Sequence, residues 1–235
     1  MGPNGEVYVA WHDVQNNALL VNSSFDGGAT FGQPVTISPT VVAFDDGIPA
    51  MASRRALLYP ACDVDRSSHA NRGTLYCSWM DETPGSGTDI FVARSTDRGA
   101  SWSTTPVRVN DDPTDVRKDQ FNQWLSVDPV TGSVNLSWND ARNDPADIKT
   151  DIFFSQSTNG GLSFAANVKV TTAMSDESAA NPFADAGNQY GDYEGIVAFD
   201  GSIHPIWTDG RFDATTDPVT GLPMGEEIFT AAITA

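Results

Sequence analysis

An eight-residue motif occurs three times in the chain and constrains its fold more than any other feature. The copies span residues 24–31, 95–102 and 157–164, and each fits Ser-x-Asp/Asn-x-Gly-x-Ser/Thr-Phe/Trp. These residue types suit a tight hairpin, because Asp or Asn can bond the backbone that follows it and Gly accepts a positive φ. Ser or Thr can close a second local bond, and the aromatic side chain can fill the apolar layer beneath. The motif therefore predicts a repeated β unit.

A second element alternates apolar and polar residues up to a tryptophan, as a half-buried strand does. Its four copies end at Trp11, Trp79, Trp138 and Trp207, which are 68, 59 and 69 residues apart. Two further strands are expected in each unit, one opening at an acidic-Ile-Phe triplet and one following the hairpin motif. A first strand precedes the Trp strand. Four antiparallel strands recurring about every 60 residues predict an all-β fold, a β-propeller with about four blades present. The expected first strands are 125–128 and 195–199, and the Trp strands are 5–13, 73–81, 132–140 and 201–209. The third strands open at residues 89, 151 and 227, and the fourth strands are 34–37, 106–109 and 168–170.

The two cysteines of the chain fall on the first two strands of one unit. When the Trp strands are aligned with one another, Val127 pairs with Val134 and the equivalent pairing places Cys62 opposite Cys77. Directly opposed residues have Cβ atoms about 4.5–5.5 Å apart. A disulfide and two buried thiols are both compatible with this register.

The charge of the chain excludes two classes of partner. With 13 Lys and Arg against 31 Asp and Glu, the net charge is −18. Phosphate backbones and acidic lipid headgroups are held mainly by Lys and Arg, so neither nucleic acid nor a membrane surface is expected to bind. No apolar run approaches the roughly 18 residues that a membrane span needs, so membrane insertion is not expected either.

The hairpin motifs resemble the Asp-box (BNR) repeats of the sialidase superfamily. The stretches 119–129 and 189–211 also resemble secreted bacterial sialidase-like proteins, and the resemblance covers nearly the whole chain. It implies a secreted or extracellular protein and a six-bladed propeller. Residues 1–235 are then expected to form a single propeller domain that lacks N-terminal blades, completed by upstream residues or by another chain.

The resemblance also implies a glycan or glycoprotein partner and hydrolysis of a terminal sialic-acid-type sugar. Such an enzyme uses an arginine cluster for the sugar carboxylate, a tyrosine nucleophile partnered by Glu, and a carboxylic acid for the leaving oxygen. The long loops opposite the hairpin motifs supply candidates, although the Arg-Ile-Pro motif of the superfamily is missing. The candidates are Arg142 and Arg211 for the cluster, Tyr193 with Glu194 for the nucleophile, and Asp192 for the acid, with Tyr190, Asp119 and Arg117 as second choices.

A non-catalytic glycan- or protein-binding module with loops braced by calcium is the rival interpretation, so enzymatic activity is left open. The candidate ligands are Asp111, Asp112 and Asp119, because hard cations take clustered carboxylates. A solvated acidic loop would explain the same residues. Arg142 and Arg211 could likewise brace their loops by pairing with the Asp two residues before them, and Tyr193 could pack at a strand entry.

Overall fold

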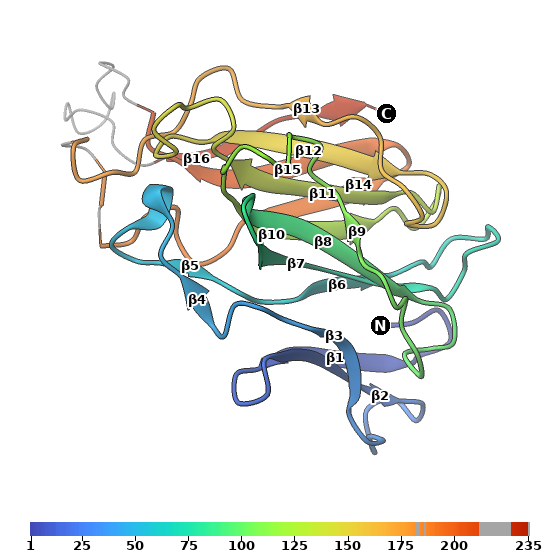
Figure 1. The fold of residues 1–235 in the computed structure, drawn as a ribbon. Helices are drawn as coiled ribbons and strands as arrows, with labels where there is room; N and C mark the ends of the chain where they lie inside the picture. The colour runs from blue at the N-terminus through green and yellow to red at the C-terminus, as the bar shows by residue number, and fades with distance from the viewer. Residues whose placement is uncertain (182–183, 186, 212–226, 235) are drawn as a thin grey trace.

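The computed structural model describes residues 1–181, 184–185, 187–211 and 227–234, and shows four antiparallel β-sheets stacked face to face (Figure 1). Each sheet is built from strands that follow one another in the chain, and each strand pairs with its neighbour in sequence, except that β17 pairs with β15. Sheet 1 contains β1 (Val7–Asp13), β2 (Ala18–Ser24) and β3 (Val35–Pro39); sheet 2 contains β6 (Ala61–Val64), β7 (Leu75–Thr83), β8 (Gly87–Ser95) and β9 (Val107–Arg108); sheet 3 contains β10 (Gln120–Val127), β11 (Val134–Asp140), β12 (Asp151–Ser157) and β13 (Val168–Lys169); sheet 4 contains β14 (Gly195–Phe199), β15 (Ser202–Asp209), β16 (Glu227–Thr230) and β17 (Ile233–Thr234).

The strands largely follow the sequence prediction, with one departure in sheet 3. β10 begins at Gln120 rather than at residue 125. The pairing of β10 with β11 shifts between Phe121 and Trp124, and Asn122 has a φ of 49°. This irregularity lets the chain continue beside β11, and a β-bulge of this kind has no simple sequence signature. In sheet 4, β16 and β17 pair with β15 in a single continuous register.

A small insertion lies between sheets 1 and 2. It holds the two-stranded pair β4 (Asp45–Asp46) and β5 (Ala56–Leu57) and the 3₁₀ turn η1 (Pro49–Met51). Ile48, Ala50 and Met51 are buried in the main apolar core, so the insertion is packed against the sheets rather than projecting from them. No helix in the described part of the chain has the length and apolar character needed to cross a membrane.

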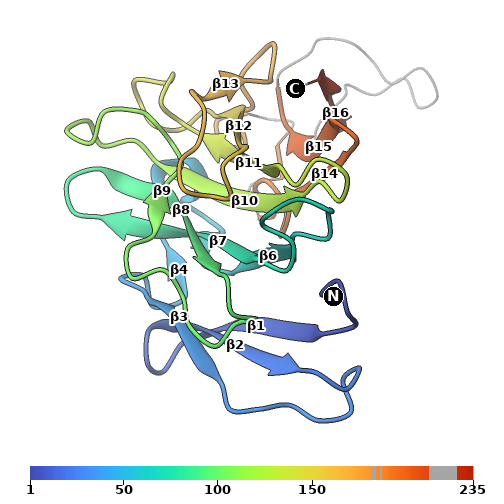
Figure 2. The same cartoon turned by 90° about the vertical axis from the view of Figure 1, so that its right-hand side faces the viewer.

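An apolar layer fills the space between each pair of successive sheets. Leu19 and Val21 of sheet 1 pack with Cys77 and Trp79 of sheet 2, and equivalent layers join sheets 2 and 3 and sheets 3 and 4. In both views, sheet 1 and sheet 4 lie at opposite ends of the stack (Figures 1 and 2). The described sheets therefore form a stack with two free ends.

The hairpin motifs close the hydrogen bonds that their residue types predict. In the second copy, the backbone amide of Gly99 donates to Ser95 Oγ at 2.9 Å, and that of Ser101 donates to Asp97 Oδ1 at 2.8 Å. The first and third copies repeat this pattern. Trp102 packs against the apolar core as expected, whereas Phe31 of the first copy is exposed. Trp102 packs at the apolar layer between sheets 1 and 2. Phe31 belongs to sheet 1, and no sheet precedes sheet 1 among the described residues.

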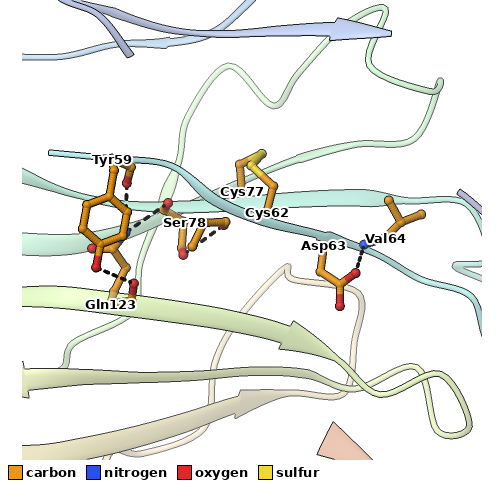
Figure 3. The surroundings of a disulfide bond; sticks show 8 residues. Tyr59, Cys62, Asp63, Val64, Cys77, Ser78 and Gln123 are labelled. Carbon is orange, nitrogen blue, oxygen red and sulfur yellow. Dashed lines mark hydrogen bonds between the residues drawn. A yellow bond between two sulfur atoms is a disulfide. The ribbon is translucent and has the colours of Figure 1, made fainter. Parts of the chain in front are cut away.

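The predicted register of the cysteines is confirmed. Cys62 pairs with Cys77 across β6 and β7, with Cα atoms 4.1 Å apart, and the two residues form a disulfide (Figure 3). Val64 and Leu75 pair beside them, as the alignment of the Trp strands predicts. The disulfide joins the first two strands of sheet 2.

Removing this disulfide is expected to destabilise the protein. Closing a loop of 15 residues restricts the unfolded chain by about 3 kcal/mol in the chain-entropy model, so replacing both cysteines with Ala should lower the free energy of unfolding by about that amount. Urea denaturation with and without dithiothreitol measures the effect. The double variant should not respond to dithiothreitol, and an unchanged wild-type midpoint under reducing conditions would contradict the expectation.

Candidate functional site

Three aromatic side chains from three successive sheets meet where the first strand of each sheet begins. Tyr59 precedes β6, Trp124 lies in β10 and Tyr193 precedes β14. The ring centroid of Tyr59 is 5.2 Å from that of Tyr193 and 6.3 Å from that of Trp124, and the Trp124 and Tyr193 centroids are 6.3 Å apart. Tyr193 is 62% exposed, so this aromatic trio presents one ring to solvent.

Tyr59 is anchored by sheet 3. Gln123 Nε2 donates to the Tyr59 carbonyl at 3.0 Å and the Tyr59 hydroxyl donates to the Gln123 carbonyl at 3.4 Å (Figure 3). Sequence reasoning did not select Tyr59 or Trp124. The repeat nevertheless contains a signal for Tyr59. Ile196 in sheet 4 is equivalent to Cys62 in sheet 2. Tyr193 and Tyr59 each lie three residues before these positions, so the two tyrosines are equivalent.

Glu194 is buried immediately behind the trio. Its carboxylate accepts a short hydrogen bond from Asn139 Nδ2 of β11. Burial raises the pKa of Glu194 well above its ordinary value, and the negative charge of Asp209 raises it further, while the bond from Asn139 acts in the opposite direction. This shift favours the neutral form of the carboxyl, in which it can act as a proton donor. Tyr193, Glu194, Trp207 and Ile228 line a surface pocket of about 330 Å³.

Asp192 lies at the solvent side of this region and forms an ion pair with Arg54 of the insertion. The two segments are joined further through Gln189, whose Oε1 accepts the backbone amide of Ser53 at 3.0 Å and whose Nε2 donates to the Ala50 carbonyl at 3.3 Å. The insertion that follows sheet 1 thus fixes the segment that carries Asp192, Tyr193 and Glu194.

Arg142 and Arg211 occupy equivalent positions in sheets 3 and 4 and do not join the trio. Arg142 Nη2 lies 2.8 Å from Asp140 Oδ2, and its guanidinium stacks on Phe153 at 4.3 Å. Arg211 pairs with Asp209 and stacks on Phe229 at 4.4 Å. In each sheet the preceding Trp also donates its indole N–H to the same Asp, at 2.9 and 3.0 Å. The predicted loop-bracing pairs are thus present, and a role in substrate binding stays a prediction.

The second choices lie apart from the solvent side of the trio. Tyr190 is fully buried against Phe121, with ring centroids 5.2 Å apart, and burial raises the pKa of its phenol. Arg117 is exposed in the loop before β10. Residues 212–226, which hold most of the predicted loop from 209 to 226, lie outside the described residues.

The three candidate calcium ligands are engaged by groups of the protein, and Asp111 and Asp112 both lie within 4 Å of the Arg142 guanidinium. Asp111 pairs with Arg142 at 2.6 Å and Asp112 pairs with Arg108 at 3.1 Å, whereas Asp119 accepts the backbone amide of Thr88 at 2.9 Å. Within the described ranges, no group of three or more Asp, Glu, His or Cys side chains is arranged to hold a metal ion. Calcium binding therefore stays a prediction.

Asp119 and Asp147 form a buried pair of carboxyl groups. Burial raises the pKa of Asp147 to about 7, and the hydrogen bond and charge of Asp119 raise it as well. The backbone amide of Asp119 donates to Asp147 Oδ1 at 3.2 Å. The raised pKa means that the folded protein is more stable when Asp147 is protonated than when both carboxyl groups are ionised.

This pair should make stability fall as the pH rises. Because the folded-state pKa of Asp147 lies above its ordinary value of 3.8, the stabilisation is complete below about pH 4 and is lost as the pH rises through about 7. Asp147→Asn should flatten the free energy of unfolding over this range and gain about 2–4 kcal/mol relative to the native protein at pH 8. Urea denaturation at pH 4 to 8 measures the profile. Asp115→Asn, at an exposed position, is the control, and equal slopes in all three proteins would contradict the pairing.

No family model matches the sequence, and no curated protein matches it. Solved structures do resemble the fold. They include an α-L-arabinanase from Penicillium chrysogenum complexed with arabinobiose (TM-score 0.56, 15% identity, 99% of this chain and 60% of that chain) and the GH93 α-L-arabinofuranosidase of Fusarium graminearum (TM-score 0.55, 15% identity, 97% and 58%). The Hadza microbial sialidase Hz136 matches with a TM-score of 0.53 at 15% identity over 97% of this chain and 42% of that chain.

These neighbours are β-propeller glycosidases, so the likeness supports the predicted propeller fold. At such identity the likeness extends to the fold alone. The chain spans about three fifths or less of the length of these structures. Closure of the described sheets into a ring is not part of this finding.

Proposed function

We propose that the protein acts on glycans and that Tyr59, Trp124, Tyr193 and Glu194 form its sugar site. The observation that supports this most is the exposed Tyr193 ring, which contacts two other aromatic rings and lines one pocket with the buried Glu194 carboxyl, whose pKa is raised. Flat aromatic rings offer an apolar surface to the C–H face of a sugar, and a protonated carboxyl can hydrogen-bond its hydroxyls or its glycosidic oxygen. Three structural neighbours are named as glycosidases or shown with a disaccharide.

For hydrolysis, we propose roles that differ from those expected from the sequence. Burial raises the pKa of Glu194 and favours its neutral form, so Glu194 rather than Asp192 is suited to protonate the leaving oxygen. Asp192 forms an ion pair with Arg54 and is therefore suited to act as the ionised partner. Glycosidases commonly need one protonated and one ionised carboxyl, and these two residues supply such a pair.

A neutral terminal sugar is the substrate class that we propose first. Arg142 and Arg211, which were expected to bind a sugar carboxylate, have Asp140 and Asp209 as partners. A guanidinium that already binds a carboxylate in its own sheet has less capacity for a second one. Sialic-acid-type sugars and non-catalytic glycan binding are the competing proposals. A secreted or extracellular location fits the disulfide, which persists in oxidising compartments.

Fluorogenic substrates test this proposal. Release of 4-methylumbelliferone from an α-L-arabinofuranoside but not from an α-sialoside would support a neutral sugar, and the reverse result would support the sialidase interpretation. If neither is cleaved, binding to a glycan array compared with that of Tyr193→Ala decides between a binding module and no glycan role. Equal array binding by the native protein and Tyr193→Ala would remove the aromatic trio from the proposal.

A further inference from the structure

One buried position of the repeat is apolar in sheet 2 and polar in sheet 3. It directly follows the tryptophan of each Trp strand, where sheet 2 has Met80 and sheet 3 has Asn139. Both residues are 0% exposed, and Met80 packs in the main apolar core. A buried amide lowers stability unless its N–H and carbonyl groups form hydrogen bonds. The asparagine of sheet 3 therefore needs a partner on each side of its amide.

Both sides of the Asn139 amide are hydrogen-bonded. Its Nδ2 donates to Glu194 Oε1, and its Oδ1 accepts from the Thr150 hydroxyl at 2.9 Å. Thr150 is buried as well, and two backbone hydrogen bonds of 3.0 and 2.8 Å join it to Ser175. Because the Thr150 hydroxyl donates to the carbonyl end of the amide, the N–H end faces Glu194. The polar exception in sheet 3 is therefore a chain of side chains that ends at the proposed acid.

This contact determines which oxygen of Glu194 carries the proton. A protonated carboxyl donates through one oxygen and accepts through the other. Asn139 Nδ2 donates to Oε1, so Oε1 is the accepting oxygen and the proton belongs on Oε2. Among the described residues, Asn139 is the one side chain whose hydrogen bond acts on the pKa of Glu194. The orientation of the acid therefore depends on a single buried amide.

The other groups around the carboxyl act on its protonation in the opposite direction. Burial and then the negative charge of Asp209 raise the pKa of Glu194, although Asp209 is itself paired with Arg211. The two phenols of the aromatic trio lie on the solvent side, and burial and then the charge of Glu194 raise the pKa of the Tyr59 phenol. The bond from Asn139 lowers the pKa of Glu194, because it stabilises the ionised form. Its removal should raise that pKa further.

We propose that Asn139 is a positioning residue of the sugar site, a role that rests on the proposed function of Glu194. Its amide holds Oε1, and this directs the proton on Oε2 toward the pocket that Glu194 lines with Tyr193. Asn139 is fully buried and acts on the sugar only through Glu194. An interaction of this kind matters in the transition state and not in substrate binding, so its loss should lower kcat and leave KM nearly unchanged.

The titration of Glu194 tests the contact without relying on activity. Asn139→Met introduces the residue that sheet 2 has at this position, and the carboxyl carbon resonance of Glu194 should then titrate at a higher pH than in the native protein. Asn135→Met is the control, because it removes another buried amide of β11 that bonds Ser133 and Gln156 instead. This control should leave the Glu194 titration unchanged. An unchanged titration in Asn139→Met overturns the proposal, whether or not the protein is an enzyme.

Kinetics on a glycoside that the native protein cleaves test the positioning itself. Asn139→Met should lower kcat about 10²-fold, the cost of a small misplacement of a reacting group, with KM nearly unchanged. Thr150→Val removes the hydroxyl that orients the amide and should also lower kcat, whereas Thr150→Ser keeps the hydroxyl and should retain the native kcat. A native kcat in Asn139→Met overturns the positioning role even if the titration of Glu194 has moved.

The two measurements separate this proposal from the proposed function. A native protein that cleaves no glycoside removes the proposed function and, with it, the role of Asn139 in a reaction. A shifted titration in Asn139→Met would still establish in that case that Asn139 controls the protonation of Glu194. A cleaved glycoside with an unshifted titration would leave the function in place and remove Asn139 from it.

Discussion

Asp140→Ala is expected to lower the free energy of unfolding by about 3–5 kcal/mol, the usual cost of removing one partner of a buried ion pair. The Asp140 side chain is fully buried and binds four groups: the guanidinium of Arg142, the backbone amide of Arg142, the indole N–H of Trp138 and the side-chain amide of Gln120. Without the carboxylate, Trp138 loses its hydrogen-bond acceptor inside the core, and Arg142 keeps its contacts with Asp111, Asn167 and the Phe153 ring. Urea denaturation followed by tryptophan fluorescence measures the loss.

Asp13 of sheet 1 provides a matched control for this prediction. It occupies the same place after Trp11, but the residue two positions later is Gln15 rather than Arg, and its carboxylate accepts bonds from exposed groups of the turn. Asp13→Ala should therefore have a much smaller effect than Asp140→Ala. If the two variants lose similar stability, the buried pairing with Arg142 and Trp138 is not what makes Asp140 important.

Glu194→Gln is expected to reduce glycosidase activity by about 10²- to 10⁴-fold, the usual contribution of a general acid. The amide has nearly the shape of a neutral carboxyl and can still accept the hydrogen bond from Asn139. It cannot deliver a proton to the leaving oxygen. The loss should appear in kcat with a folded protein, so thermal denaturation of the variant is measured beside the rate on the substrate that the native protein cleaves.

One further variant and one comparison of substrates show whether the lost activity reflects proton donation by Glu194. Tyr193→Phe keeps the aromatic ring but removes the hydroxyl, so it should retain most of the activity if Tyr193 stacks on the sugar, and should lose it if Tyr193 is the nucleophile. A substrate with a good leaving group needs little protonation and should be less affected by Glu194→Gln than one with a poor leaving group. Equal losses on both substrates would contradict the role of Glu194 as the acid.

The fold could be predicted to a large extent because the chain repeats itself. Aligning Trp79 with Trp138, and residues 64–65 with residues 127–128, placed Cys62 opposite Cys77, since pairing in an antiparallel hairpin is fixed once one pair is known. The ion pairs of Arg142 and Arg211 could be anticipated for the same reason, because Asp and Arg are two residues apart in both loops. The spacing of residues along the chain therefore predicts both the cysteine pairing and the two ion pairs.

The site could be predicted only in part, because its contacts join distant segments. Arg54 and Asp192 meet through the insertion after sheet 1, and Tyr59 meets Tyr193 across three sheets. The Arg54–Asp192 contact has no sequence signature, and the only signal for the contact of Tyr59 with Tyr193 is that they lie at equivalent positions, three residues before Cys62 and Ile196. Asp119 was grouped with Asp112 because the two are close in sequence, but Asp119 turns toward Thr88 and Asp147 at the entry of β10. Proximity along a loop does not fix the direction in which side chains point.

The layered packing also determines how local stability varies along the stack. Sheets 2 and 3 each bury apolar residues on two faces, against the sheets before and after them, whereas sheets 1 and 4 each have one covered face. In a linear array of this kind, the free energy of each unit is its own term plus one term for every neighbour. The end sheets therefore open at a smaller free-energy cost than the central ones, and their amide hydrogens exchange with solvent first. The aromatic trio begins in sheet 2 and ends in sheet 4, so its exposed ring, Tyr193, belongs to an end unit, while Tyr59 and Trp124 belong to the two central ones.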